Sequence, residues 1–353
     1  MSEQGPSTRS VHAGLPPARQ GEPFLPGPVL ASAYHLAGDD VHATYGYARD
    51  ANPTWTAYEQ ALGELEGGEV VLFSSGMAAA SAILLALEPG EVLVAPSDGY
   101  YLVRRLAEEH LAARGVDVRL VPNRQDALEE VAPGATLIVA ESPSNPSLET
   151  IDVPALRAAA GEEATLCVDN TLATPLALRP LELGATMTHA SATKALSGHS
   201  DLLLGYVATN NRMWLDRLRS WRTVTGAIPG PVETWLAHRS LATLGVRVER
   251  QTANAEALAD LLRGRDDVTD VRWPGMGAVV CFTLADSGAV ARFFAASELA
   301  IEATSFGGVH TSGERRARWG GDDIAEGFVR FSVGIEDTAD LLADIERALD
   351  STS

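Results

Sequence analysis

Lysine is almost missing from this chain. Of its 27 basic residues, 26 are arginine and one is lysine, Lys194. Arginine can replace lysine as a cation, but its guanidinium stays protonated and cannot form an imine with an aldehyde. A primary amine that can lose its proton does form one. The single lysine therefore points to Schiff-base chemistry at position 194. The alternative is that one lysine survives by chance on a solvated face.

Cysteine is scarce as well, with two residues. The chain also has no long apolar run and no net positive charge. Cys167 and Cys281 each lie in an apolar, strand-like segment, which favours buried, reduced thiols over a disulfide and fits a cytoplasmic protein. No run approaches the roughly 18 apolar residues of a membrane span, and the polar stretch Met1–Arg9 contains no secretory signal. A net charge of −20 argues against nucleic acid or an anionic membrane as a partner.

Between residues 68 and 208 the chain alternates short β-rich runs with helical patterns. Several of these runs are continuously apolar, as expected for strands that are covered on both faces. Together with helical patterns at 77–87, 100–113 and 152–160, they predict an α/β domain with a mostly parallel, seven-stranded sheet. The predicted strands are Val70–Ser74, Val92–Ala95, Val116–Val121, Leu137–Ala140, Leu166–Val168, Met187–Ser191 and Leu203–Ala208.

The regions on either side of this domain have other patterns. Residues 1–45 are rich in proline and glycine and lack periodicity, which predicts an extended N-terminal arm. A helical region at 232–262 is followed by strands near 279–284 and 327–332 and by helices near 289–297 and 338–349. We therefore expect a large domain over residues 46–245 and a smaller α+β domain over residues 246–353.

Two turns are candidates for binding a phosphate. The segment Ser74-Ser75-Gly76-Met77-Ala78 ends a strand and begins a helix, where free N–H groups and the helix dipole attract anions. Ser191 and Thr193 are two residues apart in a segment expected to be extended, so their hydroxyls should share a face beside Lys194. The alternatives are a common strand-to-helix turn and an ordinary polar strand end.

A carboxylate, Asp169, ends another apolar strand 25 residues before the lysine. At that place it can pair with a protonated pyridine nitrogen, which keeps the ring an electron sink. A helix cap is the alternative role for Asp169 by itself. The lysine, the two phosphate candidates and this carboxylate together predict a pyridoxal-phosphate site.

The chain resembles the Cys/Met-metabolism group of fold type I pyridoxal-phosphate enzymes. This group includes cystathionine γ-synthase, cystathionine γ- and β-lyases, methionine γ-lyase and the homoserine sulfhydrylases. The resemblance runs from about Thr8 to Asp337 and implies the fold type I transferase-like architecture. The motifs that carry it are Ser10-Val11-His12-Ala13-Gly14, Tyr47-Ala48-Arg49 with Asn52-Pro53-Thr54, Ser74-Ser75-Gly76-Met77-Ala78, Glu141-Ser142-Pro143-Ser144-Asn145-Pro146, Val168-Asp169-Asn170-Thr171, Ser191-Ala192-Thr193-Lys194 with Gly198-His199-Ser200-Asp201, Ser305-Phe306-Gly307-Gly308 and Arg330-Phe331-Ser332-Val333-Gly334.

The resemblance implies a role for each cofactor residue. Lys194 forms the imine with pyridoxal 5'-phosphate and then shuttles protons, Asp169 pairs with the pyridine nitrogen, and Tyr100 stacks on the ring. Tyr47 and Arg49 bind the phosphate of the neighbouring subunit in a homodimer, which is expected to form part of a homotetramer. The phosphate ligands from the same subunit are Gly76, Met77, Ser191 and Thr193.

The resemblance also implies four substrate residues. Arg330 clamps the α-carboxylate with its planar fork, Asn145 lies near the ring oxygen and the substrate, and Ser305 orients the arginine or the substrate. His310 stands where the family commonly has an acidic residue. Two further departures are Tyr101-Leu102 in place of two glycines, and a short segment from 310 to 327 that is rich in arginine. All three lie where the family contacts the distal half of its substrate.

The resemblance implies a γ-elimination on a sulfur amino acid, with cystathionine γ-lyase as the first choice. A γ-replacement, by a cystathionine γ-synthase or an O-acylhomoserine sulfhydrylase, is the alternative. A catalytically silent fold used as a binding module is a third possibility, and the set of Lys194, Asp169, Tyr100 and Arg330 argues against it. We expect no metal site, because no histidine or cysteine pair has ligand spacing.

Overall fold

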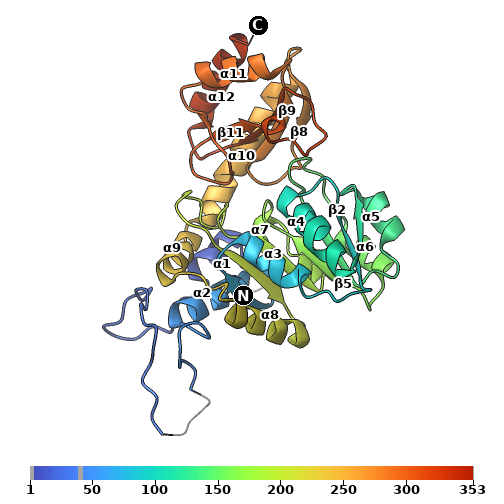
Figure 1. Ribbon diagram of the computed structural model, residues 1–353. Helices are drawn as coiled ribbons and strands as arrows, with labels where there is room; N and C mark the ends of the chain where they lie inside the picture. The colour runs from blue at the N-terminus through green and yellow to red at the C-terminus, as the bar shows by residue number, and fades with distance from the viewer. Residues whose placement is uncertain (1–3, 39–42, 353) are drawn as a thin grey trace.

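Two β-sheets organise the computed structural model, which describes residues 4–38 and 43–352 (Figure 1). The larger sheet has seven strands in the order β1-β7-β6-β5-β4-β2-β3, and the smaller has five in the order β10-β11-β12-β9-β8. In the larger sheet β2 to β6 are parallel, whereas β7 is antiparallel to both of its neighbours. This is the predicted α/β architecture with a mostly parallel sheet.

The seven strands of the larger sheet coincide with the seven predicted runs. Most of their residues are buried, except in the edge strand β3, and their bounds differ from the predicted ones by at most two residues. Continuous apolar runs are therefore a good guide here, because helices cover both faces of the sheet. The strands are β1 (Glu69–Phe73), β2 (Val92–Pro96), β3 (Asp117–Val121), β4 (Leu137–Glu141), β5 (Thr165–Asp169), β6 (Met187–Ser191) and β7 (Gly205–Thr209).

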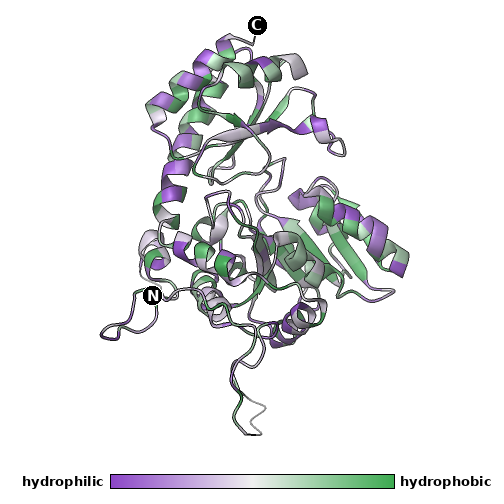
Figure 2. Ribbon diagram, turned by 60° about the vertical axis from the view of Figure 1, so that its left-hand side comes forward, coloured by the Kyte–Doolittle hydropathy of each residue, from purple (hydrophilic) through white to green (hydrophobic). Residues whose placement is uncertain are grey.

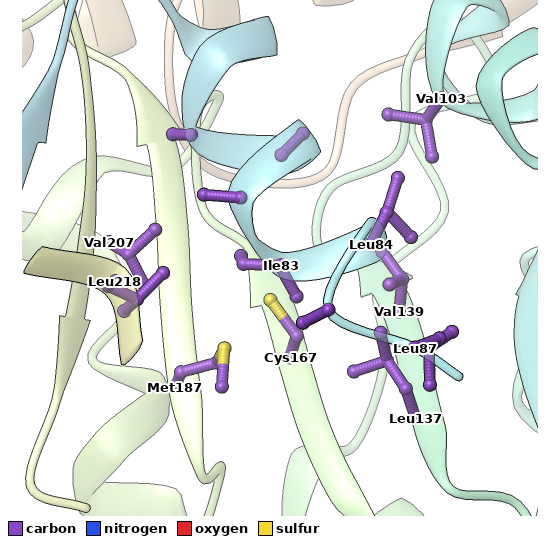
Figure 3. Close-up of a cluster of buried hydrophobic side chains, with 14 of the residues drawn as sticks. Ile83, Leu84, Leu87, Val103, Leu137, Val139, Cys167, Met187, Val207 and Leu218 are labelled. Carbon is purple, nitrogen blue, oxygen red and sulfur yellow. The ribbon is translucent and has the colours of Figure 1, made fainter. Parts of the chain in front are cut away.

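Helices cover the larger sheet in two layers. On one face α3 (Gly76–Leu84), α4 (Tyr101–Leu106) and α8 (Arg212–Thr225) bury a cluster that includes Ile83 and Leu218 (Figure 3). On the other face lie α2 (Pro53–Glu66), α5 (Gln125–Val131), α6 (Val153–Ala160) and α9 (Pro231–Leu241). Strand residues alternate between the two clusters: Val71 and Val207 face the first layer, and Leu72 and Tyr206 face the second. The sheet is the middle layer of a three-layered domain.

Several segments differ from their predicted local structure. Pro6–His12 forms helix α1, with Pro6 in its first turn, although no regular structure was expected there. This helix packs closely on α10 (Leu244–Arg263), because a side chain at Gly245 would meet the Ser7 Cα at 2.6 Å. The pattern at 100–113 is divided into α4, a π-helical turn (Ala107–Leu111) and a 3₁₀ turn (Ala112–Arg114). Short helices also occur at Thr174–Ala177 (α7), Pro180–Leu183 and Arg316–Trp319.

The smaller sheet has its own core at the C-terminal end of the chain. Its strands pack against α10, α11 (Ser287–Ala296) and α12 (Thr338–Asp350), and Phe282, Phe293 and Phe331 are fully buried between them. Most strands of the larger sheet are coloured as hydrophobic in Figure 2. The strands of the smaller sheet are β8 (Thr269–Arg272), β9 (Val279–Thr283), β10 (Ile301–Glu302), β11 (Ser312–Arg315) and β12 (Phe328–Ser332). The domain boundaries at residues 45 and 245 stay predictions.

Two sequence-based expectations concern single residue types and membranes. Cys167 and Cys281 are buried and unpaired, as predicted. Among the helices of the described residues, none combines the length and the apolar character needed to cross a membrane.

Candidate active site

The carboxyl ends of β4, β5 and β6 meet at one edge of the larger sheet, where open α/β sheets bind their ligands. Glu141 and Asp169 are register partners on β4 and β5, and Asp169 is paired with His189 on β6. A cavity of about 190 Å³ opens at this edge. Its polar lining includes Ser75, Tyr100, Glu141, Asn145, Asp169, Thr171, His189, Ser191, Thr193 and Lys194, with the backbone of Gly76 and the side chains of Met77 and Phe306.

Lys194 reaches into this cavity from the turn that follows β6. Its amine donates to the Ser305 Oγ at 2.6 Å and lies 4.9 Å from the centre of the Phe306 ring. The pKa of this amine is lowered to about 8, chiefly by burial and also by the charge of Arg330, while Glu314 opposes the shift. Because only the neutral amine is nucleophilic, this environment favours attack on a carbonyl carbon.

The turn after β6 begins earlier than the sequence suggested. The Lys194 N–H donates to the Ser191 carbonyl at 3.2 Å, so the chain is no longer extended between Ser191 and Thr193. Both side chains nevertheless line the cavity. The Thr193 hydroxyl accepts from the Leu204 N–H at 3.0 Å, which fixes it against the following strand.

Helix α3 points its N-terminus at the cavity. Ser75 caps this helix by accepting from the Ala78 N–H at 3.0 Å. A side chain at Gly76 would meet the Ser191 Cβ at 2.8 Å, so only glycine lets the helix come this close to β6. The first N–H groups of α3 and the Ser191 hydroxyl thus form a compact anion site.

Asp169 lies at the floor of the cavity with both oxygens engaged by polar groups. One oxygen accepts from the Thr171 N–H at 2.8 Å, and the other is 3.6 Å from the His189 Nε2. The alternative role as a helix cap does not apply, because α7 begins at Thr174 with Ala173 at its N-cap position. Asp169 lines the cavity, and its oxygens can accept further bonds besides these two contacts, so it can pair with a cationic group there.

Tyr100 and Asn145 are held by one buried carboxylate, Glu141. It accepts from the Tyr100 N–H at 2.5 Å and from the Asn145 N–H at 2.9 Å. The pKa of Glu141 is raised to about 8, chiefly by burial and also by the neighbouring charge of Asp169. Burial also raises the pKa of the Tyr100 hydroxyl, and the neighbouring Tyr101 raises it further. This phenol therefore keeps its proton at neutral pH.

Arg330 lies behind the cavity wall on β12. Its guanidinium donates to the Asn145 side-chain oxygen at 2.7 Å and to Glu314 at 2.5 Å, and it lies 5.1 Å from the centre of the Phe306 ring. The side chain is 5% exposed. It contacts the cavity through Asn145 and Phe306, which both line it.

Besides Arg330, four predicted site residues do not line this cavity, although one of them, Ser305, accepts from the Lys194 amine. Ser305 and His310 line a neighbouring open cavity of about 810 Å³, together with Asp201 and Glu233. Tyr47 is 48% exposed, and the exposed Arg49 lies over its ring at 5.2 Å. Neither of these two contacts the cavity of their own chain.

The sequence analysis gave no role to Glu141, Thr171, His189 or Glu314. Glu141 carries the same signal as Asp169, a carboxylate at the end of a buried strand, and could have been found. His189 lies in the middle of a strand pattern, and its Nδ1 is buried without a hydrogen-bond partner among the described residues. The contact of Glu314 with Arg330 could not be predicted from the sequence, because it depends on the pairing of β11 with β12, which places the two residues opposite each other.

The residues present fit pyridoxal phosphate. The cavity offers an anion site at Gly76 and Ser191, an aromatic ring at Tyr100, a carboxylate at Asp169 and an amine at Lys194. These match the phosphate, the ring face, the pyridine nitrogen and the aldehyde carbon of the cofactor. Among the described residues no cluster of histidine, cysteine or carboxylate side chains could hold a metal ion.

Known proteins resemble this chain over its whole length. A model of the family described as "Cys/Met metabolism PLP-dependent enzyme" matches residues 7–350. A Streptomyces coelicolor protein, provisionally named cystathionine gamma-lyase, is 49% identical over 100% of this chain and 95% of its own. Cystathionine gamma-synthase of Mycobacterium tuberculosis is 35% identical, covering 98% and 97%. The crystal structure of apo CalE6, a methionine gamma lyase from Micromonospora echinospora, superposes with a TM-score of 0.92 at 34% identity, covering 99% of this chain and 100% of that one.

Proposed function

The chain belongs to the Cys/Met metabolism PLP-dependent enzymes, and we propose that it is a carbon–sulfur lyase that cleaves cystathionine at the γ-carbon. The products are cysteine, 2-oxobutanoate and ammonia. The observation that carries this proposal is that Lys194 and Tyr100 line the same cavity. The Lys194 amine is a base of lowered pKa, and the Tyr100 hydroxyl, whose pKa is raised, is an acid that keeps its proton. The 49% identity to the Streptomyces coelicolor protein supports the choice of γ-cleavage.

Pyridoxal phosphate is the cofactor of this family, and we assign its ligands here as proposals. Lys194 holds the aldehyde carbon, Asp169 the pyridine nitrogen and Tyr100 the ring face. The phosphate is held by Gly76, Met77, Ser191 and Thr193. When bound, the cofactor supplies a cationic ring that takes up the electrons released at the substrate's α-carbon.

The side chains of this site move the protons and hold the substrate. The Lys194 amine removes the proton from the α-carbon and then serves the β-carbon, since it is the base of lowered pKa in the cavity. The Tyr100 hydroxyl gives its proton to the departing thiol. Arg330 and Asn145, joined by a 2.7 Å hydrogen bond, bind the α-carboxylate. Ser305, which accepts from the Lys194 amine, orients that amine when it is free.

We propose further that each site is completed by a second copy of this chain. Tyr47 and Arg49 are exposed and lie away from the cavity of their own chain, which supports a role at the phosphate of the neighbouring subunit. The assembly is then a homodimer with shared sites, two of which form a homotetramer. Two buried, unpaired cysteines support a cytoplasmic location.

A γ-replacement is the second candidate function. The cystathionine gamma-synthase of Mycobacterium tuberculosis is 35% identical over nearly the whole chain, and it favours this reading. Elimination and replacement share the steps at Lys194, Asp169 and Arg330, so the ligands of the cofactor do not distinguish them. The distinction lies in the groups that meet the distal half of the substrate, His310 among them.

Product analysis tests the proposal. The purified holoenzyme is incubated separately with cystathionine, homocysteine, methionine and cysteine, and with O-acetyl- or O-succinylhomoserine plus cysteine. We expect 2-oxobutanoate and ammonia from cystathionine, in excess over pyruvate. Pyruvate as the main product would move the enzyme to β-elimination, and cystathionine formed from an acylhomoserine faster than it is cleaved would favour the synthase.

A further inference from the structure

Five charged side chains are linked in a continuous, buried series of ion pairs, the ion chain, which starts at Arg330. Its guanidinium donates to Glu314 at 2.5 Å, and Glu314 accepts from Arg316 at 3.2 Å. Arg316 donates to one oxygen of Asp322 at 2.7 Å, and Arg104 donates to the other oxygen at 2.7 Å. All five side chains are 14% exposed or less. Positive and negative charges alternate along the whole chain.

The far end of this chain reaches the loop that carries Tyr100. Arg104 lies on α4, beside the larger sheet, whereas the other four residues belong to the smaller sheet and its connections. The Arg104 guanidinium also donates to the Ser97 carbonyl at 2.8 Å and to the Gly321 carbonyl at 3.0 Å. The ion chain therefore links Arg330 to both the backbone before Tyr100 and the segment after Trp319.

This ion chain of five side chains contains one more cation than anions. Three guanidiniums face two carboxylates, which leaves one positive charge without a counter-ion. The Nε atoms of Arg104, Arg316 and Arg330 are all buried without a hydrogen-bond partner among the described residues. Buried charge is unfavourable unless it is paired and hydrogen-bonded. The cluster is thus short of one anion, and a carboxylate bound at Arg330 would supply it.

The neighbouring arginines of the same segment have different surroundings. Arg315 pairs with Glu326, which is 75% exposed, at 2.6 Å, and Arg318 pairs with Glu302 at the surface. Only Arg316 turns inward to join the chain. The surface pair of Arg315 and Glu326 offers a control with the same charge types on the same segment.

We propose that Glu314, Arg316, Asp322 and Arg104 are positioning residues for the substrate's carboxylate. They hold the Arg330 guanidinium in place and leave the site one anion short, so that it takes an amino acid through a single carboxylate. This inference rests on the proposed roles of Lys194 and Arg330.

Two small amines separate the carboxylate's contribution from everything else. Glycine and methylamine both react with the cofactor of the holoenzyme, but only glycine carries a carboxylate. Each is titrated against the absorbance of the bound cofactor, and the ratio of the methylamine to the glycine dissociation constant is recorded. A looser fold would weaken both ligands alike and leave this ratio unchanged.

The ratio should fall when the ion chain is cut, because a guanidinium that the ion chain no longer holds loses the orientation that a carboxylate needs. We expect this loss to outweigh the attraction of the added net positive charge. We expect the ratio to exceed one in the unmodified protein and to drop at least tenfold in Glu314→Gln. In Asp322→Asn, two links further from Arg330, we expect a drop of about threefold or more. The control Glu326→Gln should keep the ratio of the unmodified protein. Asp322→Asn keeps the shape of the side chain and changes the ion chain far from Arg330. This variant therefore decides the test if Glu314→Gln fails to fold.

An unchanged ratio in Asp322→Asn and in folded Glu314→Gln would overturn the proposal. An unmodified protein that binds glycine no more tightly than methylamine would remove the carboxylate site itself and the positioning role with it. Neither result depends on the products formed from cystathionine, so the failure of this inference and the failure of the lyase assignment are separate outcomes.

Discussion

The proposed chemistry of this chain depends on a single residue, Lys194. Its amine is neutral far more often than that of an exposed lysine, because burial lowers its pKa to about 8. Two residues of the other sheet also act on this pKa: Arg330 lowers it as well, and Glu314 opposes the shift. Its pKa and its partners could not be read from the sequence, although its uniqueness could.

Capture of the cofactor by the apoenzyme should follow the ionisation of Lys194. Below the pKa the amine is protonated and inert, so the rate should rise about tenfold per pH unit from pH 6 and level off above about pH 8. The measurement is the rate at which the cofactor's bound absorbance appears between pH 6 and 10. Nα-acetyl-lysine, mixed with the cofactor in solution, controls for the cofactor's own ionisations. A rate that keeps rising to pH 10, as for an ordinary lysine, would contradict the lowered pKa.

His310 should tune specificity only modestly. It is exposed in an open cavity, so a carboxylate there would gain only about 0.5–1 kcal/mol from the distal ammonium of cystathionine. We therefore expect His310→Glu to raise kcat/KM for cystathionine by a factor of about 2 to 5 relative to homocysteine, which lacks that ammonium. An unchanged ratio of the two kcat/KM values would place His310 outside the substrate site.

At the scale of elements, the contact of α3 with β6 decides whether the phosphate can bind. A methyl group at Gly76 would collide with Ser191, and overpacking of this kind costs about 1–3 kcal/mol. Gly76→Ala should therefore weaken cofactor affinity by about tenfold or more, measured by absorbance titration of the apoenzyme. Gly27→Ala, with no neighbouring atom within 4 Å, is the control and should bind normally. Equal affinities in both variants would show that α3 does not hold the phosphate.

Some elements could be predicted from the sequence and others could not. Several strands of the larger sheet, such as β2 and β4, are nearly continuous apolar runs, so their residues alone reveal them. Strand β11, Ser312–Arg315, has no apolar residue and escaped prediction. Its Glu314 is buried only because the sheet places it opposite Arg330, a pairing over 16 residues that no local pattern encodes. Helix α1 forms for a similar reason, through its contact with Gly245.

At the scale of the whole molecule, the site is assembled from both sheets and, in our proposal, from two chains. Lys194 and Asp169 come from the larger sheet, and Ser305 and Arg330 come from the smaller one. Eight of the residues that the family motifs suggested line one cavity of this chain, whereas Ser305, His310, Arg330, Tyr47 and Arg49 do not. The motifs did not predict the ion chain that joins Arg330 to α4.

Shared sites should allow two inactive variants to complement each other. Lys194→Ala and Arg49→Ala should each be nearly inactive, and a mixture that exchanges subunits should regain activity. In a mixed dimer one site combines the intact Lys194 of one chain with the intact Arg49 of the other. Exchange is verified with differently tagged chains. No recovery despite verified exchange would place Arg49 outside the neighbour's site.

The attachment of the cofactor to Lys194 underlies every other step, and borohydride tests it directly. The holoenzyme is reduced, digested and analysed by mass spectrometry, with Lys194→Arg as a matched variant that keeps the positive charge but cannot form an imine. The account predicts one modified peptide, carrying the reduced cofactor on Lys194, and neither modification nor bound absorbance in the folded variant. A Lys194→Arg protein that is yellow and active, or a reduced cofactor on any other group, would contradict it.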